Sequence, residues 1–271
     1  MAVSNKESLN RVALGVEYNG RAYHGWQIQL SPDVLTIQGC LEKALSFVAN
    51  EPVRVNCAGR TDARVHGTAQ VAHIETAVIR PMKAWVQGVN AKLPDDIVVT
   101  WAVPVTNDFH ARFSATARHY QYFIANTVVR PAIHAGAVTW IKGALSEVAM
   151  NEAAQSLIGL HDFTSFRASS CQSHTGIRTI HSIKVSRRND LVVIDVRANA
   201  FLHHMVRNIA GALLVVGKGL QSKVWFDQVF EARDRTKSSP TAAPDGLYLV
   251  DVTYPESFGL PQQFKSPVWL V

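Results

Sequence analysis

A polar loop at residues 58–67 carries side chains that could perform chemistry. Its sequence, AGRTDARVHG, places Asp62 between Arg60 and Arg64, with glycines near both ends that let the backbone turn sharply. Nearby positive charge lowers a carboxyl pKa, so the flanking arginines would keep Asp62 ionised, and an ionised carboxylate can act as a nucleophile. The same residues also suit a solvated hairpin tip whose ion pair contributes about 0–1 kcal/mol. The loop alone leaves both interpretations open.

The elements that must position this loop follow from the hydrophobic pattern. In the first half, alternating or β-branched segments predict strands at residues 11–18, 53–58, 69–75 and 97–103. Helical spacing of apolar residues predicts helices at residues 36–48 and 82–89. The second half repeats this order, with strands at residues 119–124, 180–186, 191–196 and 247–252 and helices at residues 145–157 and 201–216.

This β-α-β-β-α-β order, used twice, predicts an α+β fold built of two ferredoxin-like halves. Residues 1–113 would form the N-terminal ferredoxin-like domain with the catalytic loop, and residues 114–271 the C-terminal one. No linker rich in Gly, Ser or Pro separates them, so we expect one joined, mainly antiparallel sheet flanked by helices.

Composition limits the class of protein. Of 271 residues, 47% are hydrophobic, and Lys plus Arg exceed Asp plus Glu by 27 − 21 = 6, a modest excess that suits a polyanionic partner without requiring one. Three scattered cysteines favour a reducing compartment over a disulfide framework. The first ten residues lack the apolar core of a signal peptide, and no apolar run approaches the ~20 residues that cross a bilayer. We therefore expect a cytoplasmic protein without a membrane partner.

Six ordered blocks between residues 11 and 252 resemble the tRNA pseudouridine synthase A family. The GRTD sequence of residues 59–62 is similar to the catalytic loop of that family. The other five blocks are YNG with HGWQ at residues 18–27, NDFHARFSATARHY at residues 107–120, DFTSFR at residues 162–167, NAFLHHMVRN at residues 199–208, and GLYL at residues 246–249.

The resemblance implies a role for individual residues. Asp62 would attack the target uridine, Arg207 would pair with Asp62, and Tyr120 would pack against the base. Arg60 would contact RNA near the flipped nucleotide, and His204 would share a helix face with Arg207. Leu247 would line the pocket, and candidates for phosphate contacts are Arg112, Arg118, Arg167, Lys184, Arg187 and Arg188.

The resemblance also implies partners. The substrate would be the anticodon arm of tRNA, at uridines 38, 39 and 40, bound by a homodimer. Because the reaction is an isomerisation in which a protein carboxylate supplies the covalent help, no cofactor and no metal is expected.

One position departs from the family pattern. The family usually has glycine two residues after the aspartate, and this chain has Arg64. If the position requires a positive φ, the side chain costs about 1 kcal/mol or more of backbone strain. It would also set a bulky cation near the nucleophile, so we expect reduced activity.

Parts of the sequence also resemble two other classes of protein. A zinc nucleobase deaminase would use the H-x-E sequence of His73 and Glu75, but the P-C-x-x-C half of its signature is absent. The eleven histidines form no evident ligand set, since His203 and His204 are adjacent and should diverge on a helix. The alternative function is a non-catalytic RNA-binding protein, whose nearest aromatic strand, HYQYF at residues 119–123, lacks the glycines and basic opening of an RNP motif.

Overall fold

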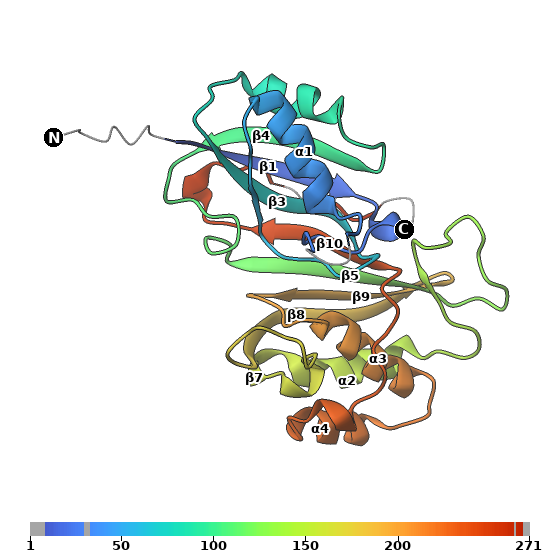
Figure 1. Ribbon diagram of the computed structural model, residues 1–271. Helices are drawn as coiled ribbons and strands as arrows, with labels where there is room; N and C mark the ends of the chain where they lie inside the picture. Colours follow the sequence, from blue (N-terminus) through green and yellow to red (C-terminus); the bar gives the residue numbers. More distant parts are fainter. Residues whose placement is uncertain (1–8, 30–32, 263, 268–271) are drawn as a thin grey trace.

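A single large sheet organises the molecule. The computed structural model describes residues 9–29, 33–262 and 264–267. Within them the strands follow the order β4-β1-β3-β10-β5-β9-β8-β7, with β2 pairing with β3 and β6 pairing with β5 (Figure 1).

The first half builds one end of this sheet. Its strands are β1 (Asn10–Tyr18), β2 (Val55–Cys57), β3 (His66–Thr76) and β4 (Ile97–Val105). The helix α1 (Ile37–Ala49) is capped by Thr36, whose side chain accepts a hydrogen bond from the Gly39 N–H, and it buries Leu41 and Leu45 against β1 and β3. A short π-helix (Ala84–Gly88) precedes β4. The strand order β4-β1-β3-β2, antiparallel throughout, is that of a ferredoxin-like unit.

The second half repeats the arrangement. Its strands are β5 (Ala117–Ala125), β6 (Thr139–Trp140), β7 (Gly159–Asp162), β8 (Ile177–Arg188), β9 (Leu191–Ala198) and β10 (Leu247–Thr253). Its helices are α2 (Glu147–Ala154), α3 (Met205–Gly217) and α4 (Lys223–Glu231). The strands β10-β5-β9-β8 reproduce the order of the first half, and the helices α2 and α3 pack beside β8 and β9 (Figure 1). Short 3-10 turns lie at Gly20–Ala22, Gln155–Leu157, Thr164–Phe166, Arg235–Lys237 and Glu256–Phe258.

The two halves join where β3 meets β10. This pair is parallel, with Tyr248 opposite His66 and Leu249 opposite Gly67, whereas the neighbouring main strands are antiparallel. The largest apolar cluster extends from Ala13 and Val71 in the first half to α2 and α3 in the second. The α+β fold with a joined, mainly antiparallel sheet is thus confirmed.

The beginning of α3 differs from the prediction. A helix was expected over residues 201–216, but α3 begins at Met205 because His204 adopts a left-handed conformation with φ 61°. The strands β6 and β7 and the helix α4 were not predicted. Both strands are short, with two and four residues, and give little periodicity to detect.

Candidate active site

The loop between β2 and β3 is held on three sides. The Gln70 side-chain amide donates to the Gly59 carbonyl at 2.7 Å, and the Tyr18 and Thr61 hydroxyls share a hydrogen bond of 2.9 Å. The Trp26 N–H donates to the Thr61 carbonyl at 3.0 Å. Since Gln70 and Tyr18 are themselves buried, these contacts fix the loop directly before Asp62.

A glycine allows a second loop to pack against this one. Gly25 has φ 89°, and a Cβ atom built on it would lie 2.7 Å from the Thr61 carbonyl oxygen. Any other residue would be strained by its backbone angle and would also push the loop away. The loop that carries Asp62 therefore depends on a bare backbone at position 25.

The Asp62 carboxylate is surrounded by three cationic or titratable side chains. Arg207, from α3, places Nη1 3.1 Å from Oδ2. His203 Nε2 lies 3.4 Å from Oδ1, and His204 Nε2 lies 3.5 Å from Oδ2. The Asp62 side chain is 19% exposed, so the carboxylate is mostly enclosed but open to a ligand on one side.

These neighbours determine the charge of the site. Burial by itself would raise the pKa of the Asp62 carboxyl, but the hydrogen bond from His203 and the charges of His204 and Arg207 outweigh it, so the pKa lies below its ordinary value. The hydrogen bond to Asp62 raises the pKa of His203, whereas burial lowers the pKa of His204. Asp62 is thus an ionised, aimed carboxylate at neutral pH.

The arginines next to Asp62 in sequence do not provide its counter-charge. Arg60 is exposed and its Nη1 donates to the Gln172 side chain at 3.4 Å. Arg64 donates to both carboxylate oxygens of Asp245, from Nε at 3.0 Å and from Nη2 at 3.1 Å. The expectation that the flanking arginines keep Asp62 ionised is wrong, because their side chains extend to partners elsewhere.

Arg64 has a positive φ of 68°, the backbone conformation that a glycine would adopt without strain. Its guanidinium is held by Asp245 rather than left free beside the nucleophile. The strain anticipated from the sequence is therefore present, whereas the paired cation gives no support to an obstruction.

The two adjacent histidines do not diverge as expected. Because His204 is left-handed and precedes α3, both imidazoles turn to the same side, with ring centroids 4.0 Å apart. His203 was not singled out from the sequence, and the expectation that the two rings diverge is wrong. The only sequence signal for this pair was that His203 and His204 are consecutive, and this signal becomes informative only when the left-handed conformation of His204 is known.

An apolar wall lies beside the carboxylate. Tyr120 on β5 is 7% exposed and meets the Phe201 ring edge to face, with centroids 5.0 Å apart. Burial, together with the charge of Asp62, raises the pKa of Tyr120, so its hydroxyl stays protonated. Leu247 is buried at the start of β10, in the same apolar cluster as Tyr120. Phe201 is the member of this wall that the sequence reasoning missed.

The predicted phosphate-binding arginines separate into two groups. Arg118 is buried and its guanidinium donates to the carbonyls of Ala58, Arg112, Ala115 and Asn199, so it ties loops together and is not available to a phosphate. Arg187 is held by Glu147 at 2.8 Å, and Arg167 donates to the carbonyls of Cys171 and Ser173. The exposed members of the set are Arg112, Lys184 and Arg188.

The two alternative classes lose their structural basis. His73 is buried and its Nδ1 accepts a hydrogen bond from the Ala111 N–H, which leaves it a structural residue. The aromatic strand proposed for RNA stacking is internal, since Tyr122 and Phe123 are fully buried. Exposed aromatics on β5, the feature an RNP-type module requires, are absent from the described strand.

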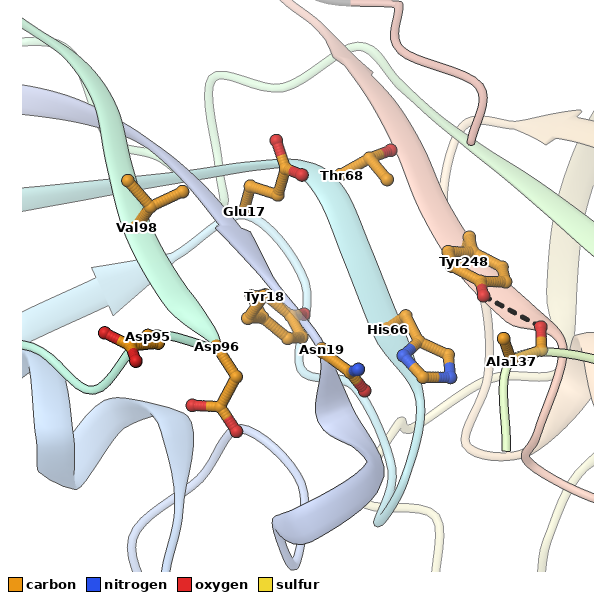
Figure 2. A pocket seen from close by; sticks show the side chains of 10 residues that line it. All are labelled: Glu17, Tyr18, Asn19, His66, Thr68, Asp95, Asp96, Val98, Ala137 and Tyr248. Carbon is orange, nitrogen blue, oxygen red and sulfur yellow. Dashed lines mark hydrogen bonds between the residues drawn. The ribbon is translucent and has the colours of Figure 1, made fainter. Parts of the chain in front are cut away.

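A separate hollow lies near the joint of the two halves. Its volume is about 320 Å³, and Figure 2 shows Glu17, Asp96, His66 and Tyr248 on its wall. Tyr248 alternates on β10 with Leu247 and Leu249, which pack in the cluster of Tyr120, so this hollow faces the opposite side of the sheet from the candidate site. None of the predicted catalytic residues lines it.

The described helices include none with the length and apolar character needed to span a membrane.

The comparisons with known proteins agree with the class that this fold and site define. A family profile described as tRNA pseudouridine synthase matches residues 15–114 and 153–255. The chain is 55% identical over 261 residues to a tRNA pseudouridine synthase A of Shewanella piezotolerans, covering 96% of this chain and 99% of that protein. It is 55% identical over 260 residues to the protein of the same name from Pseudoalteromonas atlantica, covering 96% and 98%. The chain belongs to the tRNA pseudouridine synthase family, a family of isomerases, and the resemblance seen in the sequence is confirmed.

A more distant similarity is to a solved archaeal box H/ACA sRNP Nop10-Cbf5 complex. It covers 75% of this chain and 43% of that chain, with 12% identity and a TM-score of 0.35.

Proposed function

We propose that this chain converts uridine to pseudouridine in tRNA, with Asp62 as the nucleophile. The observation that carries the proposal is the Asp62 carboxylate itself: it is mostly buried, held 3.1 Å from Arg207, and fixed on a loop whose backbone is anchored on three sides. A solvated hairpin tip would have none of these features.

The reaction is an isomerisation in which every atom of the base is kept. Asp62 forms a covalent bond to the uridine, the bond between N1 and the ribose C1′ breaks, and the base turns so that its C5 bonds to C1′. The bond between Asp62 and the nucleoside breaks with its electron pair returning to the carboxylate, the proton on C5 leaves, and N1 gains a proton, so the free carboxylate is regenerated. The chain's own residues supply the nucleophile, so the proposal requires no external oxidant, reductant or cofactor.

Neighbouring residues would prepare Asp62 and the base. Arg207 keeps the carboxylate ionised and oriented, because it also donates from Nε to the Ala242 carbonyl at 2.9 Å and therefore has little freedom. Tyr120 and Leu247 form an apolar surface on which a uracil ring can pack. His204 lies at the rim, 30% exposed, where it can meet the nucleotide.

The target uridine must leave its helix before it can reach a recessed carboxylate. Extrusion of a base costs a few kcal/mol, which contacts to the flipped base and to the phosphates must offset. Arg60, in the loop that carries Asp62, and Arg112, in the block of residues 107–120, are exposed and are candidates for such contacts. Uridines 38 to 40 of the anticodon arm, the homodimer and the cytoplasmic location follow from the resemblance and stay predictions.

The experiment compares release of tritium from tRNA labelled at C5 of uridine, followed by mapping of pseudouridine along the anticodon arm. Asp62→Asn should bind tRNA with parental affinity and release tritium at least about a thousandfold more slowly, because an amide cannot act as the nucleophile. Asp190→Asn, an exposed aspartate at the β8–β9 turn, is the matched control and should convert like the parent. Normal conversion by Asp62→Asn would refute the assignment.

A further inference from the structure

The carboxylate and the two histidines also form an arrangement that suits a metal ion. We propose that Asp62, His203 and His204 bind a divalent transition metal of the zinc class, and that the bound metal inhibits the enzyme by occupying the nucleophile. The inhibitory part rests on the proposed function of Asp62, whereas the binding part rests on the ligand geometry alone.

The distances fit a tetrahedral site. One ligand atom from each residue lies within 4.8 Å of the others, with 3.4 Å from Asp62 Oδ1 to His203 Nε2 and 3.5 Å from Oδ2 to His204 Nε2. Zinc bonds of about 2.0–2.1 Å in a tetrahedron place neighbouring ligand atoms about 3.3 Å apart. Because the two histidines lie nearest to different oxygens of Asp62, separations of up to 4.8 Å must shorten by up to about 1.5 Å, which side-chain rotation can supply, and three protein ligands leave a fourth position for water.

The histidines are held in position before any metal arrives. The Nδ1 atom of His203 lies 3.1 Å from the Ser170 hydroxyl, which fixes the ring and leaves Nε2 directed at Asp62. Such a partner on the second ring nitrogen is a usual feature of histidine ligands. The left-handed backbone of His204 is a strained conformation for a histidine, and it brings the second imidazole to the same side as the first.

The site is accessible and chemically selective. The side chains of His203 and His204 are 40% and 30% exposed, so an ion can enter from solvent. Two imidazoles with one carboxylate suit Zn²⁺, Co²⁺ or Cu²⁺ rather than Mg²⁺ or Ca²⁺, which prefer oxygen ligands. Arg207 shares Oδ2 of Asp62 and opposes a cation, so we expect binding that a chelator readily reverses.

Binding is tested on the full chain after treatment with a chelator, without RNA. Titration with Co²⁺, followed by its visible absorption, should show one tetrahedral ion per chain. His203→Gln and His204→Asn should each weaken binding at least about tenfold, since each removes one ligand. Asparagine is chosen at position 204 because it tolerates the left-handed conformation. His181→Gln, on an exposed position of β8, should bind like the parent. Absence of Co²⁺ binding by the parent, or parental binding by both site variants, would refute the metal site.

Inhibition is tested separately in the tritium-release assay. Zn²⁺ should stop conversion by the parent, EDTA should restore it, and His203→Gln should require at least about tenfold more Zn²⁺ for half-inhibition. Unchanged sensitivity in that variant would refute inhibition through this site. If the parent fails to convert any uridine, the proposed function fails, and the Co²⁺ titration still decides the metal site independently.

Discussion

At the scale of the residue, the charge on Asp62 comes from a contact between distant parts of the chain. Arg207 lies 145 positions away in sequence, and it pairs with Asp62, whereas Arg60 and Arg64 bind elsewhere. Spacing in the loop could suggest an ionised carboxylate, but it could not identify the partner. Only the resemblance to a family pointed to Arg207, because long-range pairings leave no local pattern in a single sequence.

Arg64 allows the cost of its backbone angle to be measured. Arg64→Ala removes the ion pair with Asp245 but keeps a Cβ atom at φ 68°, whereas Arg64→Gly removes both. The glycine variant should therefore be the more stable of the two by about 0.5–1 kcal/mol in urea denaturation, because relief of strain exceeds the entropy that glycine adds to the unfolded chain. Its conversion rate should stay near that of the parent.

Ala63→Gly is the control for this comparison. Ala63 is exposed and lies outside the left-handed region, so glycine there should destabilise the protein. If Arg64→Gly were instead less stable than Arg64→Ala, the positive φ would carry no cost.

At the scale of the element, the periodic spacing of apolar residues predicted the main strands and helices. The strands β1, β3, β4, β5, β8, β9 and β10 were all anticipated within a few residues, because each alternates or buries β-branched residues. The beginning of α3 was missed, since Phe201 and Leu202 extend the apolar pattern before Met205 although the backbone there is not helical. A left-handed histidine has no signature in composition, and it is the feature that brings both imidazoles to Asp62.

Two glycines separate the effect of a clash from the effect of strain. Gly25 and Gly143 have nearly equal angles, φ 89° and 91°, but a Cβ atom would meet the Thr61 carbonyl at 2.7 Å in one case and nothing within 4 Å in the other. Gly143→Ala should lose about 1 kcal/mol of stability and keep its activity. Gly25→Ala should lose more stability and at least about tenfold in conversion rate, because displacing the loop by about 1 Å misplaces Asp62. Equal rates in the two variants would argue that the loop is not positioned by Gly25.

At the scale of the whole molecule, the segment that connects the halves is hydrogen-bonded to both of them. The segment between β4 and β5 is held by His73 of the first half, whose Nδ1 accepts from the Ala111 N–H at 3.1 Å. Tyr254 and Arg118 of the second half donate to the carbonyls of Ala111 and Arg112. Since one backbone segment satisfies polar groups of both halves, we expect them to unfold together.

His73 makes this joint sensitive to acid. Burial, with the nearby charges of His110 and Arg11, lowers the pKa of His73 from 6.5 to about 4. Between pH 6.5 and pH 4 the imidazole is protonated in the unfolded chain but neutral in the folded chain. The contribution of His73 to the free energy of unfolding is therefore fully present above pH 6.5 and is lost as the pH falls towards 4. The contribution is on the order of 3 kcal/mol. Urea denaturation of the parent between pH 7 and pH 4 measures it together with every other titrating group.

The variant His73→Asn isolates the contribution of this one residue. An asparagine oxygen can still accept from the Ala111 N–H but does not titrate, so the variant should lose less stability than the parent over the same pH range. The difference between the two slopes belongs to His73 and its coupling with His110, because groups farther away titrate alike in both chains. Identical slopes would mean that the pKa of His73 is the same in the folded and unfolded chains, against the effect of burial. A smaller slope in the variant, with both halves still unfolding in one transition, is the expected result. It would show that the unprotonated Nδ1 of His73 stabilises the segment that joins the two ferredoxin-like units.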